Sequence, residues 1–249
     1  MKRSLGNTIQ IPDTYSPTIL DRIQRTRNNL GVDIWTCYEV SWINQEGVPQ
    51  YRIAQMKISS LTTYIVESKS LKLYLNGFNN IRLSEKEFIR RWESDISALI
   101  ESPVSVTFYN YSQWSNLDTE DIKGTSIDEM TGASTPLLDT KEIVKETLVS
   151  HLFRSVCPVT SQPDWATILI TYTGHKLNPI ALREYIISFR NKAAFHESCI
   201  DEMYTYLIDI AQFTELSISG LFNRRGGIDI MPDRKSTRLN SSHQIISYA

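Results

Sequence analysis

The chain has 249 residues, of which 41% are hydrophobic, 10% aromatic and 22% charged, values that are typical of a soluble globular protein and exclude a disordered or collagen-like chain. Its formal net charge of −2 leaves no basic excess, so direct binding to nucleic acid through phosphate neutralisation is not expected. No apolar stretch is long enough for a membrane helix and the first residues lack the apolar core of a signal peptide, so we expect a cytoplasmic protein with a small-molecule ligand and no membrane partner.

The first part of the chain predicts an N-terminal extension followed by a compact module. Residues 1–32 are polar and are expected to wrap around the body of the protein. The module then has, in order, a strand over 33–44, a strand over 50–60, helices over 67–78 and 84–99, and a strand over 104–111. The second helix has the clearest start, because Ser84 and Glu87 have the spacing of a capping box.

The second part of the chain repeats this order of elements. Residues 116–140 are polar with little periodicity and predict a linker or insertion. After them come a run at 142–153 that could be helix or strand, a strand over 165–173 ending at Gly174, helices over 179–190 and 197–212, and a strand over 215–222. The repeat predicts two tandem α+β modules, residues 33–115 and 141–232, each an antiparallel sheet with a pair of helices on one face.

The last segment of the chain differs in character from the rest. Residues 233–249 resemble the in-frame translation of a sequencing adapter, and we exclude them from the functional argument. The alternative is a genuine polar C-terminal tail, which the composition also permits.

Cys157 and Asp164 are the first candidates for chemistry. The three cysteines of the chain form no CxxC pair, which argues against a disulfide framework or a cysteine-rich zinc site. Cys157 follows a predicted element in the segment CPVTSQPDW, where Pro158 and Pro163 bracket a stiff loop that could present a thiol. A carboxyl seven residues on, Asp164, could move protons for it. Considered alone, Cys157 could be a small buried hydrophobe, as most free cysteines are, and Asp164 a turn or capping residue.

Three further segments could bind a ligand, each with an ordinary structural alternative. His196-Glu197 could bind the amidine-like edge of a purine-like ring, or simply begin a helix. Lys69 and Lys72 could bind phosphate, or lie on a solvated helix face. The sequence Arg224-Arg225-Gly226-Gly227 could let a phosphate approach the backbone closely, or form an ordinary turn.

Together these segments resemble the long, two-module NADPH-dependent 7-cyano-7-deazaguanine reductases of the tunnelling-fold superfamily, over about residues 33–232. The resemblance lies in four separated segments in the right order: ESKSLKLY at 67–74, CPVTSQPDW at 157–165, His196-Glu197, and RRGGIDIMP at 224–232. Met231 departs from the pattern, because asparagine is expected at that position.

The resemblance implies an activity and a set of site residues. Cys157 would add to the nitrile of 7-cyano-7-deazaguanine to give a thioimide, and Asp164 would protonate the nitrile nitrogen. Two NADPH would then complete the reduction to the aminomethyl product, a step of queuosine biosynthesis for tRNA modification. The substrate would be bound by Val66, Glu67, Ser68, His196 and Glu197, and NADPH by Ser68, Lys69, Arg225 and Gly226. The family further implies a homodimer and no metal.

Two other functions stay open from the sequence. One is a pterin or purine enzyme of the GTP-cyclohydrolase type on the same fold, whose zinc form needs clustered cysteine and histidine ligands that this chain does not place close together in sequence. The other is a purine-binding module without catalysis.

Overall fold

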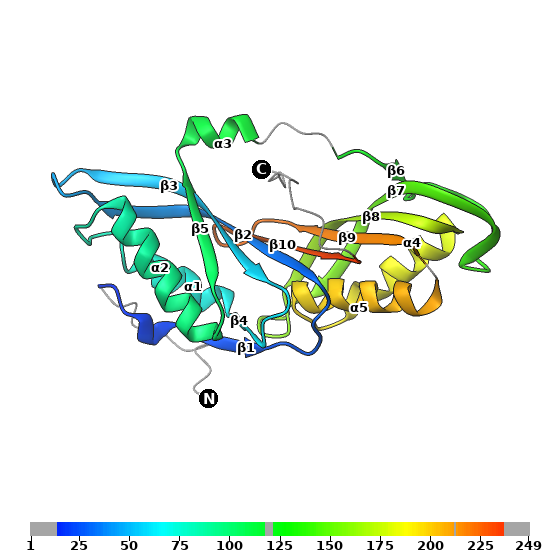
Figure 1. Ribbon diagram of the computed structural model, residues 1–249, viewed down its shortest axis with the longest axis horizontal. Helices are drawn as coiled ribbons and strands as arrows, with labels where there is room; N and C mark the ends of the chain where they lie inside the picture. The colour runs from blue at the N-terminus through cyan, green and yellow to red at the C-terminus, as the bar shows by residue number, and fades with distance from the viewer. Residues whose placement is uncertain (1–13, 118–121, 212, 237–249) are drawn as a thin grey trace.

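A computed structural model describes residues 14–117, 122–211 and 213–236, and it has an α+β fold built on one eight-stranded sheet (Figure 1). The strands are β2 (Gly31–Ile43), β3 (Pro49–Ser59), β5 (Val104–Tyr109), β6 (Thr125–Ser126), β7 (Leu138–Val156), β8 (Pro163–Leu177), β9 (Glu215–Phe222) and β10 (Ile228–Lys235). Their spatial order is β5-β3-β2-β10-β9-β8-β7-β6, with antiparallel neighbours throughout except that β6 runs parallel to β7. Strands β1 (Arg22–Gln24) and β4 (Tyr64–Val66) form a separate small sheet.

The helices cover the sheet in two pairs. Helices α1 (Ser68–Asn76) and α2 (Glu85–Ile100) lie against the half that contains β2, β3 and β5, and α4 (Pro179–Ser188) and α5 (His196–Ile210) lie against the other half, on the same side in Figure 1. The short helix α3 (Tyr111–Leu117) lies on the opposite face, where Trp114 packs with Tyr38 and Ile53. Two single-turn 3-10 helices span Pro17–Ile19 and Phe189–Asn191. No helix in the described ranges has both the length and the apolar character needed to cross a membrane.

Two hydrophobic cores lie against the two halves of the sheet, and the first includes Ile228 and Ile230 of β10, which the sequence assigns to the second module. In the first, Trp35, Cys37 and Trp42 of β2 pack against Phe88 and Trp92 of α2. The apolar positions of α2 recur every four residues, which places them on one buried face. The predicted start of this helix is confirmed, since the Ser84 hydroxyl accepts a hydrogen bond from the Glu87 amide at 3.2 Å.

The second core lies under β7, β8 and β9 and is filled by aliphatic and aromatic side chains of α4 and α5, such as Leu182, Ile200 and Met203. The segment left open at 142–153 is part of the long strand β7. Strand β8 runs from Pro163 to Leu177, so Gly174 does not end it as we predicted.

Strand β10 joins the two halves into one sheet. It pairs with β2 of the first half along Ile228–Arg234 and with β9 of the second half along Asp233–Lys235. Strand β10 was not predicted from the sequence. Two sheets were predicted, whereas the structure has one continuous sheet. The α+β class and the two helix pairs, one for each half of the sheet, are confirmed.

The strand also continues past the boundary predicted at residue 232. Arg234 is fully buried, and its guanidinium donates hydrogen bonds to Asp33 of β2 at 2.8 Å and to Asp201 of α5 at 2.8 and 3.0 Å. Residues 233–235 are therefore an integral part of the sheet. Residues 1–13 of the predicted extension and 237–249 of the predicted tail lie outside the described residues, and the adapter origin of the tail stays a prediction.

Candidate functional site

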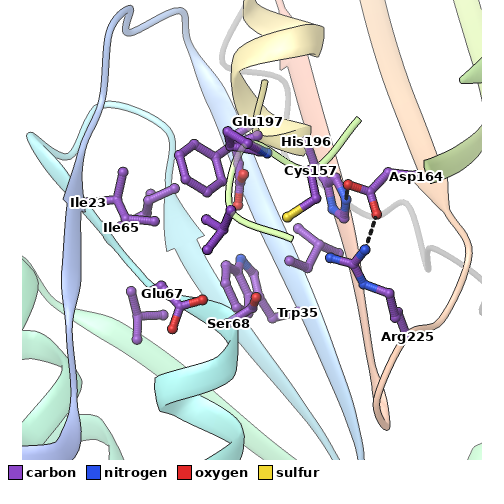
Figure 2. Close-up of a pocket in the computed structure, with 15 residues that line it drawn as sticks. Ile23, Trp35, Ile65, Glu67, Ser68, Cys157, Asp164, His196, Glu197 and Arg225 are labelled. Carbon is purple, nitrogen blue, oxygen red and sulfur yellow. Dashed lines mark ion pairs between the residues drawn. The ribbon is translucent and has the colours of Figure 1, made fainter. Parts of the chain in front are cut away.

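Two adjoining pockets lie where the two halves of the molecule meet, and Figure 2 shows the first of them. One wall comes from the end of β4 and the start of α1, and the other from the loop after β7, the start of α5 and the turn before β10. Cys157, His196 and Arg225 line both pockets. A single thiol therefore faces two neighbouring spaces.

Cys157 is held in a closed loop. Its amide donates to the carbonyl of Gln162 at 2.9 Å, and its carbonyl accepts from the amide of Ser161 at 3.0 Å. Burial raises the pKa of the Cys157 thiol, but hydrogen bonds from Thr160, Val159 and the Arg225 side chain outweigh burial, so the pKa lies below its usual value.

The other two cysteines have the opposite character. Burial raises the pKa of Cys37 well above its usual range and that of Cys199 to about 12. Both lie in the hydrophobic cores. Of the three, Cys157 is the thiol suited to act as a nucleophile.

Asp164 is the second residue of β8 and is 7% exposed. One carboxylate oxygen lies 2.9 Å from Nη1 of Arg225, the pair drawn as a dashed line in Figure 2, and the other lies 3.3 Å from Nε2 of His196. The imidazole of His196 is stacked on Phe222 with ring centroids 3.9 Å apart. Two side chains from different elements thus orient this carboxylate at the edge of the Cys157 pocket.

Glu197 and Glu67 approach the first pocket from opposite halves. Glu197 is 3% exposed, and its Oε1 has no hydrogen-bond partner within the described part of the chain. Burial, followed by the nearby negative charge of Asp33, raises the pKa of the Glu197 carboxyl. The Glu67 carboxylate is the N-cap of α1 and accepts from the amides of Lys69 at 3.0 Å and Ser70 at 2.7 Å, a role that the sequence analysis missed.

The second pocket is suited to an anionic ligand such as NADPH. Lys69, Lys72 and Arg225 supply cationic groups to its lining. Gly226 has a φ of 63°, and a side chain there would begin 3.2 Å from Nζ of Lys72, so glycine keeps the backbone accessible beside that ammonium group. The neighbouring Arg224 does not line either pocket, because its guanidinium lies 4.2 Å from the centre of the Tyr38 ring.

All ten residues predicted for the site line one or both pockets. They are Val66, Glu67, Ser68, Lys69, Cys157, Asp164, His196, Glu197, Arg225 and Gly226. Two lining residues were not predicted from the sequence: Trp35 in the first pocket, labelled in Figure 2, and Thr160 in the second. Nothing in the local pattern marks Trp35 as different from the other core tryptophans, whereas Thr160 could have been noticed as a hydroxyl inside the thiol loop. Within the described ranges, no three His, Cys, Asp or Glu residues cluster as a metal site would require.

Family models match the chain in two places. Residues 10–108 match "Nitrile reductase, 7-cyano-7-deazaguanine-reductase N-term", and residues 163–241 match "QueF-like protein". Among solved structures, the apo form of an archaeosine synthase QueF-Like is similar over 41% of this chain and 99% of its own, with 14% identity and a TM-score of 0.35, which is too slight a likeness to carry an argument.

Three curated relatives, each called NADPH-dependent 7-cyano-7-deazaguanine reductase, align over most of their length. The protein of Buchnera aphidicola subsp. Schizaphis graminum is 39% identical over 84% of both chains. That of Hydrogenovibrio crunogenus is 38% identical over 94% of this chain and 92% of its own, and that of Bordetella avium is 35% identical over 93% and 92%. With this identity and coverage, and with the predicted site residues gathered around one thiol, the chain belongs to the family of NADPH-dependent 7-cyano-7-deazaguanine reductases.

Proposed function

We propose that the chain reduces the nitrile of 7-cyano-7-deazaguanine to an aminomethyl group with NADPH, in queuosine biosynthesis. The observation that carries the proposal is the position of Cys157, a thiol of lowered pKa between a pocket suited to a ring and a pocket suited to a dinucleotide. A nitrile carbon accepts hydride poorly, and a nucleophilic thiol removes that difficulty by first converting the nitrile to a thioimide.

The first pocket would hold the deazaguanine ring. Oε1 of Glu197 is buried without a partner and would accept the N–H donors at the amidine edge of the ring. Glu67 and Ser68 would contact the ring from the start of α1, with His196 on the opposite wall and Val66 as an apolar surface. A ring held from both halves would place its nitrile next to Cys157.

The reaction would begin with attack by the Cys157 sulfur on the nitrile carbon. A carbon–sulfur bond forms, one C–N π bond breaks, and the nitrogen takes a proton through Asp164. When bound in the second pocket, NADPH would supply the two hydrides that the carbon needs, one for the thioimide and one for the imine left after sulfur departs. Asp164 and His196 lie 3.3 Å apart, so the protons that the nitrogen needs could pass along this pair.

Lys69, Arg225 and Gly226 would contact NADPH in the second pocket, with Ser68 between the two ligands.

We also propose a cytoplasmic homodimer. Strand β6 pairs with only two residues of the 19-residue strand β7, so most of the outer edge of β7 has no partner strand in the described part of the chain and could pair with a second copy.

The test is turnover with 7-cyano-7-deazaguanine, followed by NADPH absorbance and by chromatography of the product. We expect two NADPH oxidised for each aminomethyl product. Asp164→Asn should slow turnover while ring binding to the variant stays close to that of the unchanged protein. The proposed function would be rejected if NADPH were not consumed with this substrate, and the proton-transfer role of Asp164 would be rejected if Asp164→Asn turned over at the same rate.

A further inference from the structure

Arg225 lies beside the carboxylate of Asp164, in addition to lining the pocket for NADPH. Its guanidinium Nη1 lies 2.9 Å from Asp164, and its side chain lines both pockets together with Cys157. The family resemblance assigns Arg225 to the cofactor alone. The structure also pairs its guanidinium with Asp164 beside the first pocket, as Figure 2 shows.

The turn before β10 determines this placement. The Arg225 amide donates to the carbonyl of Ile228 at 2.9 Å, and Gly226 and Gly227 have φ angles of 63° and 80°. Both φ angles lie in the left-handed region that glycine adopts without strain, so the two glycines favour this turn. The two adjacent arginines have different surroundings, with Arg224 against Tyr38 and Arg225 against Asp164.

We propose that Arg225 is a catalytic residue of the thiol addition: its guanidinium stabilises the Cys157 thiolate and holds Asp164 in position to carry the thiol proton to the nitrile nitrogen. The inference rests on the proposed function. The step is balanced, because the sulfur loses a proton and bonds to carbon, one π pair moves to nitrogen, and nitrogen takes the proton that Asp164 accepted. Neither an oxidant nor NADPH is needed for it.

The charges around the thiol explain why one cation matters. The other titratable groups that line the two pockets are Glu67, Lys69 and Lys72 near α1, Asp164 of β8, and His196 and Glu197 of α5. Three of these six are carboxyl groups, which disfavour a thiolate nearby. Without Arg225, the remaining permanent cations in this lining would be the two lysines of α1, which line only the second pocket, whereas Arg225 lines both pockets with Cys157.

The experiment measures thioimide formation without NADPH, so that any effect on cofactor binding is silent. Protein and 7-cyano-7-deazaguanine are mixed at about pH 6 to 10, quenched at intervals, and the adduct is quantified by intact mass. For Arg225→Gln we expect adduct formation at neutral pH to slow by about tenfold or more and the midpoint of its pH profile to rise by about one unit, since one pKa unit is a tenfold change in thiolate fraction. Arg225→Lys keeps the charge and should restore part of the rate.

Arg224→Gln is the matched control, because it removes the same charge one residue away and should leave both rate and midpoint unchanged. The inference is overturned if Arg225→Gln forms adduct at the unchanged rate and midpoint, and a rise in the KM for NADPH alone would then assign Arg225 to the cofactor only. If the unchanged protein forms no adduct at any pH, the proposed function fails instead. Far-ultraviolet circular dichroism shows whether each variant is folded. If Arg225→Gln is not folded, the rate and midpoint of a folded Arg225→Lys are compared with those of the unchanged protein.

Discussion

Replacing the buried Arg234 by methionine should strongly destabilise the fold. Its guanidinium makes hydrogen bonds of 2.8 to 3.0 Å with Asp33 and Asp201, and the three side chains are at most 2% exposed. Removing one partner of a buried ion pair leaves an uncompensated charge and costs about 3–5 kcal/mol. For a chain of this size, such a loss lowers the melting temperature by about 6–20 °C.

The assay is urea or thermal unfolding followed by circular dichroism, with two comparison variants. Arg234→Lys keeps a charge but cannot bridge both aspartates with a planar fork, so we expect an intermediate loss. Lys235→Met alters the next residue, whose ammonium group is 3.9 Å from Asp233 and partly exposed, and should cost no more than about 1 kcal/mol. If Arg234→Met cost less than about 1 kcal/mol, the conclusion that residues 233–235 are integral to the sheet would be refuted.

Three further predictions concern the helix cap, the turn and the ring-binding carboxyl. Ser84→Ala removes the N-cap of α2 and should lower the free energy of unfolding by about 1 kcal/mol in urea titrations, and no loss would show that the cap bond is unimportant. Gly227→Ala forces a side chain into a φ of 80° and should cost about 1–3 kcal/mol and raise the KM for NADPH, whereas unchanged kinetics would separate the turn from the cofactor pocket. Burial and Asp33 raise the pKa of Glu197, and the proposed function has the ionised carboxylate accept hydrogen bonds from the ring, so calorimetry with Cys157→Ala should show binding that weakens as pH falls through that raised pKa. Adding Glu197→Gln should abolish this dependence, and an unchanged pH profile would contradict the role of Glu197.

Elements with a strong local signal could be predicted from the sequence. Helix α2 has a side-chain cap at Ser84 and an apolar position every four residues, and β9 alternates apolar and polar residues over the span that the structure confirms. In both cases the chain needs only one face buried, and the spacing of side chains is enough to reveal it.

Strand β10 could not be predicted in this way, because its partners are distant in the sequence. Seven consecutive residues of β10 are buried, and they include Asp229, Asp233 and Arg234. Charged residues are expected to be exposed when their ion-pair partners are not known. The partners of Arg234 are Asp33 and Asp201, which are distant in the sequence. For the same reason, the sequence did not show that the sheet continues past the boundary predicted at residue 232.

The residues of the site could be predicted from the family resemblance. The ion pairs and pKa shifts among them could be known only from the structure. Cys157, Asp164 and Arg225 lie on a loop, a strand and a turn, so no sequence spacing could reveal that the Arg225 guanidinium pairs with Asp164 beside the pocket of Cys157. The lowered pKa of Cys157 depends on the same tertiary contacts.

The most direct test of the central claim is peptide mapping of the protein after mixing with 7-cyano-7-deazaguanine in the absence of NADPH. We predict one adduct with the full mass of the substrate on the peptide that contains Cys157, its loss on addition of NADPH, and its absence in Cys157→Ala. Cys199→Ala, which removes a core thiol of raised pKa, should form the adduct normally. An adduct that persists in Cys157→Ala, or no adduct in a protein that still consumes NADPH with this substrate, would contradict the claim that Cys157 is the nucleophile.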